Sequence, residues 1–241
     1  MDGRYLHERE PAVLREQAAW LHRQRVAVFV DLSDEVNLYP GLRLINNLAL
    51  DYTASMSVIT NTLDKMSILG ARDLILSLHR YPENNFTDEQ TRAAFETTLR
   101  VVARLAESNH IILHLRMAFG KPPGSLAEMS ALLDKVGASN LRIAASTALL
   151  VRADDSAKAR PILQEKLGLW LVAGARTDAA GALWDAHAPL HKLPDLGPIA
   201  AWLALCPDRP MLLDTLSTTP DEVYLDAVAL ARLQAQSKSL R

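Results

Sequence analysis

The sequence predicts an α/β fold in which strands and helices alternate to form a TIM-barrel-like (β/α) barrel. Short runs rich in Val, Ile and Leu alternate with longer segments of helical periodicity. This alternation is typical of parallel strands joined by crossover helices. The length of 241 residues also suits one barrel. We therefore expect residues 1–241 to form a single domain.

The first half of the chain is expected to begin with a helix over Pro11–Gln24. The elements predicted after it are a strand over 26–32, a strand over 42–48, a helix over 53–69, a strand over 73–79, a helix over 87–108, a strand over 111–115 and a helix over 125–136. Gly70 suits the end of a helix. Thr87, followed by Gln90, suits an N-cap.

The second half continues the alternation. The predicted elements are a strand over 141–145, a helix over 156–167, a strand over 168–173, a short helix over 198–205, a strand over 211–214 and a helix over 220–236. Residues 184–191 are expected to be a loop, and 236–241 a frayed tail.

The predicted strands are one short of an eightfold barrel, and the chain opens with a helix where such barrels usually open with a strand. We expect the first strand to be missing. The chain is then a piece excised from a longer protein, or the barrel is incomplete and partly open, and we favour the former.

Composition narrows the range of partners. A formal net charge of −2, with acids and bases intermixed, gives no basic surface for nucleic acid. No apolar run approaches the roughly 18 residues that span a membrane, and the polar first residues do not resemble an export signal. Cys206, the only cysteine, lies in an apolar segment and is expected to be a buried, inert thiol. We expect a cytoplasmic protein.

Two segments between Ser57 and Val151 resemble the xylose-isomerase-like barrels, a family of sugar isomerases, sugar epimerases and a DNA-repair endonuclease. The run KMSILGARDLILSLH is similar to the family's helix, Leu-Gly-Ala turn and strand ending in His. The run LLDKVGASNLRIAASTALL is similar to its helix, short Asn-containing turn and following strand. The resemblance covers less than half of the chain and implies a TIM barrel with a sugar-sized pocket.

The family commonly holds a divalent metal with Glu, Asp and His at the strand ends, and most of these positions differ here. His79 matches a family His, but His114-Leu115-Arg116 stands in the place of a Glu. Ser146 and Leu149 stand in the place of an Asp and a His, and Asp214 alone could take the place of the last acid. Such a degenerate set cannot bind a divalent ion well. We therefore expect no cofactor, with a divalent metal held by this degenerate set as the alternative.

Because the active sites of such barrels lie at the carboxyl ends of the strands, polar residues there are the candidates. The catalytic candidates are His79, His114 and Asp214. The imidazoles of the two histidines can move a proton near neutral pH. The candidates for substrate binding are Asp31, Asn47, Arg80, Arg116, Ser146 and Arg176. Guanidinium groups would anchor a carboxylate or phosphate. His114 and Arg116 are two residues apart, so both must lie on one face of their strand.

A second interpretation is structural. His79 and His114 would be hydrogen-bonded residues beneath the loops, and the arginines would pair with Glu83 and Asp31. Trp184, near His187 and His191, is a further candidate for stacking on a sugar. A metal pair formed by these two histidines is disfavoured because Pro189 lies between them.

The favoured function is a divergent sugar isomerase- or epimerase-like barrel that binds a small carbohydrate or sugar acid. One alternative is a non-catalytic barrel that supports a neighbouring domain or partner, or assembles as a homo-oligomer. Another is a glycoside hydrolase, which needs two carboxylates across a glycosidic bond. Its candidates are Asp31, Glu35, Glu83 and Asp214.

Overall fold

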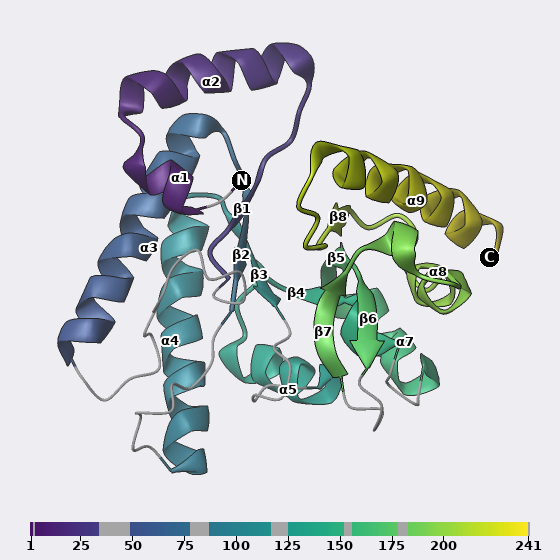
Figure 1. Cartoon of the computed structure of the whole chain (residues 1–241). Helices are drawn as coiled ribbons and strands as arrows, with labels where there is room; N and C mark the ends of the chain where they lie inside the picture. The colour runs from purple at the N-terminus through teal and green to yellow at the C-terminus, as the bar shows by residue number, and fades with distance from the viewer. Residues whose placement is uncertain are drawn as a thin grey trace. The chain divides into compact units, whose positions relative to one another are not determined.

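The computed structural model describes Met1 and residues 3–33, 49–77, 87–116, 125–151, 156–177 and 183–240. The chain divides into two compact units, Met1–Arg142 and Ile143–Arg241. Each unit has its own parallel strands and its own covering helices (Figure 1).

The first unit alternates helices and strands as the sequence predicts. Its elements are α1 (Gly3–Glu8), α2 (Pro11–Gln24), β1 (Phe29–Asp31), α3 (Ala49–Leu69), β2 (Asp73–Leu76), α4 (Asp88–Ser108), β3 (Ile112–Arg116) and α5 (Leu126–Val136). β2 pairs in parallel with both β1 and β3. The short α1 was not predicted, and the strand expected over 42–48 lies outside the described residues.

Local signals set the helix ends. Thr87 forms a capping box: its hydroxyl accepts from the backbone N–H of Gln90 at 3.2 Å, and the Gln90 side chain accepts from the N–H of Thr87 at 2.8 Å. The Ser125 hydroxyl likewise caps α5 by accepting from the N–H of Glu128. Gly137 ends α5 with a φ of 67°, which glycine adopts without steric cost.

The three strands of the first unit have two different faces. One face is apolar and fully buried, and its side chains are those of Val30, Leu32, Leu74, Leu76, Leu113 and Leu115. α4 packs against β3, and α3 lies beside α4 (Figure 1). Strand alternation sends every other side chain to the opposite face, which is mostly polar. That opposite face positions the candidate site.

Met1 lies beside the outer edge of β1. Its nitrogen donates to the carbonyl oxygen of Phe29 at 2.6 Å, and the N–H of Asp31 donates to the carbonyl oxygen of Met1 at 2.9 Å. These two bonds have the pattern of a parallel pairing one residue long. In the sheet formed by the described strands, β1 is an edge strand.

The second unit begins within β4, the strand that crosses the boundary between the units. Its elements are β4 (Leu141–Ser146), α6 (Thr147–Leu150), α7 (Ser156–Lys166), β5 (Leu167–Val172), β6 (Gly174–Thr177), β7 (Leu183–Ala188), the 3-10 helix η2 (Leu190–Lys192), α8 (Gly197–Leu203), β8 (Met211–Leu213) and α9 (Pro220–Ser239). β5 pairs in parallel with both β4 and β8.

Two expectations for the second unit were wrong. Residues 184–191 are not simply a loop, because β7 pairs antiparallel with β6, with Gly174 opposite Ala188. This hairpin follows β5 after a single residue, and its pairing provides the backbone partners that strand residues need. The last helix does not fray at 236, because α9 continues to Ser239 and Ser237 is fully buried.

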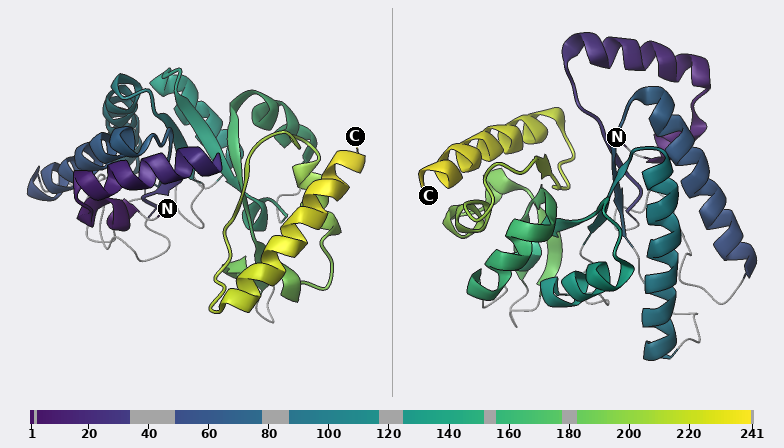
Figure 2. Two further views of the ribbon diagram at one scale, coloured as in Figure 1. Left: turned by 90° about the horizontal axis from the view of Figure 1, so that it is seen from above. Right: turned by 180° about the vertical axis from the view of Figure 1, so that it is seen from behind.

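α8 and α9 pack side by side in the second unit (Figure 2). Ile199 and Trp202 of α8 and Leu233 of α9 are buried. Among the helices of the described ranges, none combines the length with the run of apolar residues needed to cross a membrane.

Candidate functional site

The polar face of β1–β3 carries the first group of candidate residues. We define it by Asp31, Ser33, Asp73, Ser77, His114 and Arg116. The register aligns Phe29 with Asp73 and Ile112. Two residues further along each strand, it aligns Asp31 with Ile75 and His114. Since parallel neighbours in register share a face, these side chains lie on one side of the strands. The contacts described next confirm this arrangement.

Arg116, the last residue of β3, binds two residues at the carboxyl end of β1. Its Nη1 donates to the hydroxyl of Ser33 at 3.1 Å and lies 3.7 Å from Oδ2 of Asp31. The Arg116 side chain is only 1% exposed, whereas that of Asp31 is 30% exposed. Burying a guanidinium is costly unless it is paired and hydrogen-bonded. Asp31 and Ser33 supply that compensation and hold Arg116 in place.

Asp31 is itself held by the backbone that follows β1. Its Oδ1 accepts from the N–H of Ser33 at 2.7 Å, a local side-chain bond typical of Asp at the start of a turn. The carboxylate therefore has one oxygen on its own turn and the other toward Arg116. The pairing that the structural interpretation of the sequence expected for Asp31 is present, and Glu83 lies outside the described residues.

His114 lies on the same face but bonds in the other direction along the strands. Its Nε2 is 2.8 Å from Oδ1 of Asp73, the first residue of β2. A carboxylate only accepts, so Nε2 carries a proton. The ring is buried and lies 6.4 Å from that of Phe29. The predicted common face of His114 and Arg116 is confirmed, but Arg116 bonds at the carboxyl ends while His114 bonds toward the amino ends.

Some buried polar atoms on the polar face have no hydrogen-bond partner among the described residues. Within the part of the chain that the structure describes, neither Nδ1 of His114 nor the hydroxyl of Ser77 has a hydrogen-bond partner. His114 is 2% exposed and Ser77 is 3% exposed. Buried polar atoms in folded proteins almost always find a partner, so such exceptions need an ordered water or a ligand.

The strand ends of the second unit are held together by Thr147. Its hydroxyl donates to the carbonyl oxygen of Ala173 at 2.8 Å and accepts from the N–H of the same residue at 3.1 Å. These bonds join the end of β4 to the end of β5. Ser146, which ends β4, is buried, and Arg176 on β6 is half-buried.

His187 and Asp214 form a pair at the carboxyl ends of β5 and β8. The N–H of Asp214 donates to the carbonyl oxygen of Val172 at 3.0 Å and so extends the pairing of these strands. Nδ1 of His187, on β7, lies 2.9 Å from the carbonyl oxygen of Asp214 and 3.5 Å from its Oδ2. Both side chains are largely buried, with 17% exposed for His187 and 11% for Asp214.

His191 has a different partner, so the two histidines do not form a pair. Its Nδ1 donates to Oδ1 of Asp226 on α9 at 2.7 Å, and its backbone N–H donates to the same oxygen at 3.0 Å. The hydroxyls of Thr215 and Ser217 donate to Oδ2 of this fully buried carboxylate. Burial by itself raises the pKa of Asp226, but the bonds from His191, Ser217 and Thr215 outweigh it and lower the pKa to about 2.

The remaining sequence candidates cannot be located. Asn47, His79 and Arg80 lie outside the described residues, as do the carboxylates Glu35 and Glu83. Sequence reasoning missed Asp73 and the pairing of His187 with Asp214. Asp73 opens a strand rather than ending one, so the search among strand ends passed over it. His187 lies on the hairpin that was expected to be a loop.

The described residues do not fit the divalent metal that the family resemblance implies. Among them, no group of three or more His, Cys, Asp and Glu side chains is arranged to hold an ion. β3 ends in a buried guanidinium, and the Thr147 hydroxyl at the end of β4 is engaged by the backbone of Ala173. Neither is a ligand for a hard cation.

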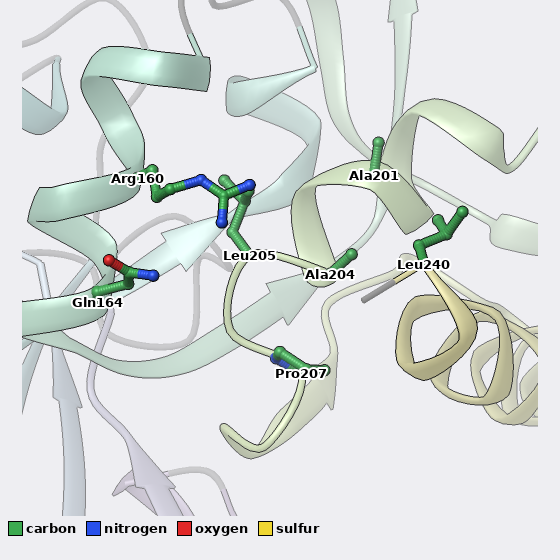
Figure 3. A pocket seen from close by; sticks show the side chains of 7 residues that line it. All are labelled: Arg160, Gln164, Ala201, Ala204, Leu205, Pro207 and Leu240. Atoms are coloured by element: carbon green, nitrogen blue, oxygen red, sulfur yellow. The ribbon is translucent and has the colours of Figure 1, made fainter.

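A surface pocket of about 600 Å³ lies elsewhere in the second unit, between α7, α8 and the end of α9 (Figure 3). It is lined by Arg160, Gln164, Ala201, Ala204, Leu205, Pro207 and Leu240. No candidate from the sequence lines it. Neighbouring Cys206 is only half-buried, so its expected full burial was wrong, and this partial burial raises the pKa of its thiol.

Comparison with solved structures identifies the class of fold. The chain has a TIM-barrel-like fold, as the sequence predicted, and one of its structural neighbours is described as a xylose-isomerase-like TIM barrel. One neighbour is 3-keto-D-glucoside 4-epimerase from E. coli, with a TM-score of 0.67 and 14% identity over 97% of this chain and 87% of that one. Another, D-psicose 3-epimerase in the presence of D-fructose, has a TM-score of 0.69 and 14% identity over 99% and 84%.

A third neighbour is a xylose-isomerase-like TIM-barrel protein from Mycobacterium smegmatis in complex with magnesium. It has a TM-score of 0.63 and 14% identity over 97% of this chain and 91% of that one. Identities this low establish a common fold and leave function to the side chains. No protein-family model matches the chain, and no curated protein matches it either.

Proposed function

We propose that this protein is a sugar isomerase- or epimerase-like barrel that binds a small polar or anionic carbohydrate at the carboxyl ends of its strands. The observation that carries the proposal is the polar face of β1–β3. It holds the ion pair of the buried Arg116 with Asp31, and it also holds Nδ1 of His114 and the Ser77 hydroxyl, which have no partner among the described residues. A carbohydrate, rich in hydroxyl groups that both donate and accept, would satisfy such atoms.

The described residues of the first unit have distinct roles in this proposal. Arg116 donates to a hydroxyl or an acidic group of the sugar, and Asp31 accepts from a second hydroxyl. The Ser77 hydroxyl and Nδ1 of His114 are further polar contacts, and His114 is the proton-transfer candidate. Asp73 holds the imidazole through Nε2.

Candidates from other parts of the chain complete the proposal. In the second unit, Asp214 is a catalytic candidate and Ser146 and Arg176 are binding candidates. Asn47 and Arg80 as binding candidates and His79 as a catalytic candidate rest on the sequence alone, because they lie outside the described residues. Because the described donor set does not fit a divalent ion, no step of the proposal uses one.

The glycoside hydrolase alternative has weaker support. The two described carboxylates of the polar face, Asp31 and Asp73, are each engaged by a basic partner, Arg116 and His114. A glycoside hydrolase needs one carboxyl group that is protonated and acts as the acid. It needs a second carboxylate that is free to act as nucleophile or base beside the glycosidic bond. The non-catalytic alternative stays a prediction that a binding experiment can test.

Calorimetric titration of the full chain tests the proposal, with D-fructose, its C3 epimer D-psicose, D-gluconate and D-fructose 6-phosphate as probes. We expect at least one to bind, and Arg116→Met to weaken that binding by tenfold or more. Arg100→Met is the matched control, because Arg100 pairs with Glu96 on the outer surface of α4. The proposal fails if none of the four binds, or if both variants bind equally well.

Proton exchange then tests the isomerase or epimerase activity. The chain is incubated with the sugar that binds in D2O, and the sugar is followed by proton NMR. Exchange of a carbon-bound proton, or the appearance of an isomer, is the expected result. Binding without either outcome would favour the non-catalytic alternative.

A further inference from the structure

The surface pocket between α7, α8 and the end of α9 is not used by the proposed function. Its volume of about 600 Å³ lies within the range of about 300–1,000 Å³ that is typical of small-molecule sites. All of its lining residues belong to the second unit, and none of them is a candidate from the strand ends. A ligand bound in this pocket would therefore not contact those candidates.

The polar part of the pocket comes from α7 alone. Arg160 and Gln164 are four residues apart, so they lie on one face of this helix. In Figure 3 both side chains extend from α7 toward the other walls of the pocket. Within the residues that the structure describes, neither the Arg160 guanidinium nor the Gln164 amide has a hydrogen bond or an ion pair. Both therefore offer N–H donors to a ligand.

The other walls of the pocket are apolar. They are formed by Ala201 and Ala204 at the end of α8, by Leu205 and Pro207 in the segment after it, and by Leu240 after α9. The two alanines have small side chains, which leaves space that larger side chains would fill. No acidic side chain is among the described residues that line the pocket. A few polar groups on a mostly apolar lining are typical of small-molecule sites.

The thiol of Cys206, in the segment that forms one wall, is influenced by the charges near the pocket. Burial raises the pKa of this thiol, Arg209 and Arg160 oppose the rise, and Asp208 adds to it. Two guanidinium groups thus act on this segment against one carboxylate. The local charge favours an anion.

We propose that this pocket binds a small amphipathic carboxylate, whose charged group accepts hydrogen bonds from Arg160 and Gln164. Its apolar body packs against Ala201, Ala204 and Leu205. A guanidinium can hold a carboxylate through two parallel N–H bonds. A sugar would bring hydroxyl groups against the apolar walls, where they find no partner. The inference is therefore independent of the proposed function.

Octanoate is the probe, and the test uses the full chain. We expect octanoate to shift the methyl NMR resonances of Ala201 and Ala204, and calorimetry gives its dissociation constant. Octanamide has the same apolar chain without the charge. It should bind more weakly than octanoate by about fivefold or more, because the charge-assisted hydrogen bonds are lost.

Two variants with matched controls test the two parts of the pocket. Arg160→Met should weaken octanoate binding by about fivefold or more for the same reason as octanamide. Ala201→Leu keeps the guanidinium but fills the space beside it, and it should weaken binding by about tenfold or more. The controls are Arg232→Met and Ala231→Leu, since both residues are exposed on α9 and do not line the pocket. Both controls should bind octanoate as the parent does.

The outcomes that would overturn the proposal are specific. Octanoate might leave both alanine methyl resonances unmoved, or octanamide might bind as tightly as octanoate. Equal binding by Arg160→Met and Arg232→Met would remove the role of the guanidinium, and equal binding by the two leucine variants would place octanoate outside the pocket. Should a variant not fold, the comparison of octanoate with octanamide in the parent decides.

Discussion

In the first unit, Nη1 of Arg116 lies 3.7 Å from Oδ2 of Asp31, although the two residues belong to strands separated by β2. The guanidinium therefore extends across the middle strand and also binds the Ser33 hydroxyl. One buried side chain thus connects the ends of β1 and β3, and the stability of this region depends on it.

Arg116→Met should reduce the free energy of unfolding by about 1–3 kcal/mol. It leaves Asp31 without its ion-pair partner, and the loss stays below the full cost of breaking a buried pair because Asp31 is 30% exposed. Urea denaturation measures the difference. In a double-mutant cycle, Asp31→Asn should cost less in the Arg116→Met background than in the parent. Additive losses would contradict a direct interaction.

Asp226→Ala should lower the free energy of unfolding by about 2–4 kcal/mol, because it leaves the donors of His191, Thr215 and Ser217 without their buried acceptor. Chemical denaturation of the full chain checks this value. Glu165→Ala, an exposed carboxylate of the same unit, should stay within about 0.5 kcal/mol of the parent. Equal losses in the two variants would rule out the proposed role of Asp226.

Stability should fall between about pH 4 and pH 2 through the protonation of Asp226. Its pKa is lowered from 3.8 to about 2 by the hydrogen bonds that outweigh its burial. Since the folded state favours the ionised form, this contribution is fully present above the unfolded pKa and is lost as pH falls through the folded one. It amounts to about 2 kcal/mol.

The measurement is the difference in unfolding free energy between the parent and Asp226→Asn at pH 5 and at pH 2. Glu222 also has its pKa lowered to about 2, first by the Lys192 side chain and then by the N–H and hydroxyl of Thr218. It is present in both proteins, so the difference isolates Asp226. A difference that does not shrink toward pH 2 would count against this prediction.

Gly174→Ala should destabilise the β6–β7 hairpin by about 1 kcal/mol. An added Cβ would lie 2.6 Å from a terminal carbon of Leu193, so this side chain must move. Leu193→Ala made in addition should recover part of the loss relative to the sum of the two single variants. Thermal unfolding of the three variants measures the coupling, and strictly additive effects would mean that Leu193 is not the obstacle.

The elements were predictable because their signals are local. Thr87 and Gln90 predict the start of α4, because their capping box forms within one turn of the helix. Alternation alone placed His114 and Arg116 on one face of β3, and the predicted TIM-barrel-like fold, with its possible incompleteness, was confirmed. The hairpin β6–β7 was missed because its pairing depends on a partner strand rather than on a pattern in either segment.

The sequence by itself determined the alternation of strands and helices, and it named Asp31, His114, Arg116 and Asp214 as residues near strand ends. One interpretation of the sequence also expected the arginines to pair with Asp31, but only the tertiary structure decided the partners of His114 and Asp214. Asp73 lies 41 residues before His114, and His187 lies 27 residues before Asp214. Hydrogen bonds and ion pairs act over a few ångströms, so they depend on how distant segments fold together, whereas caps and strand alternation are fixed by neighbouring residues along the chain.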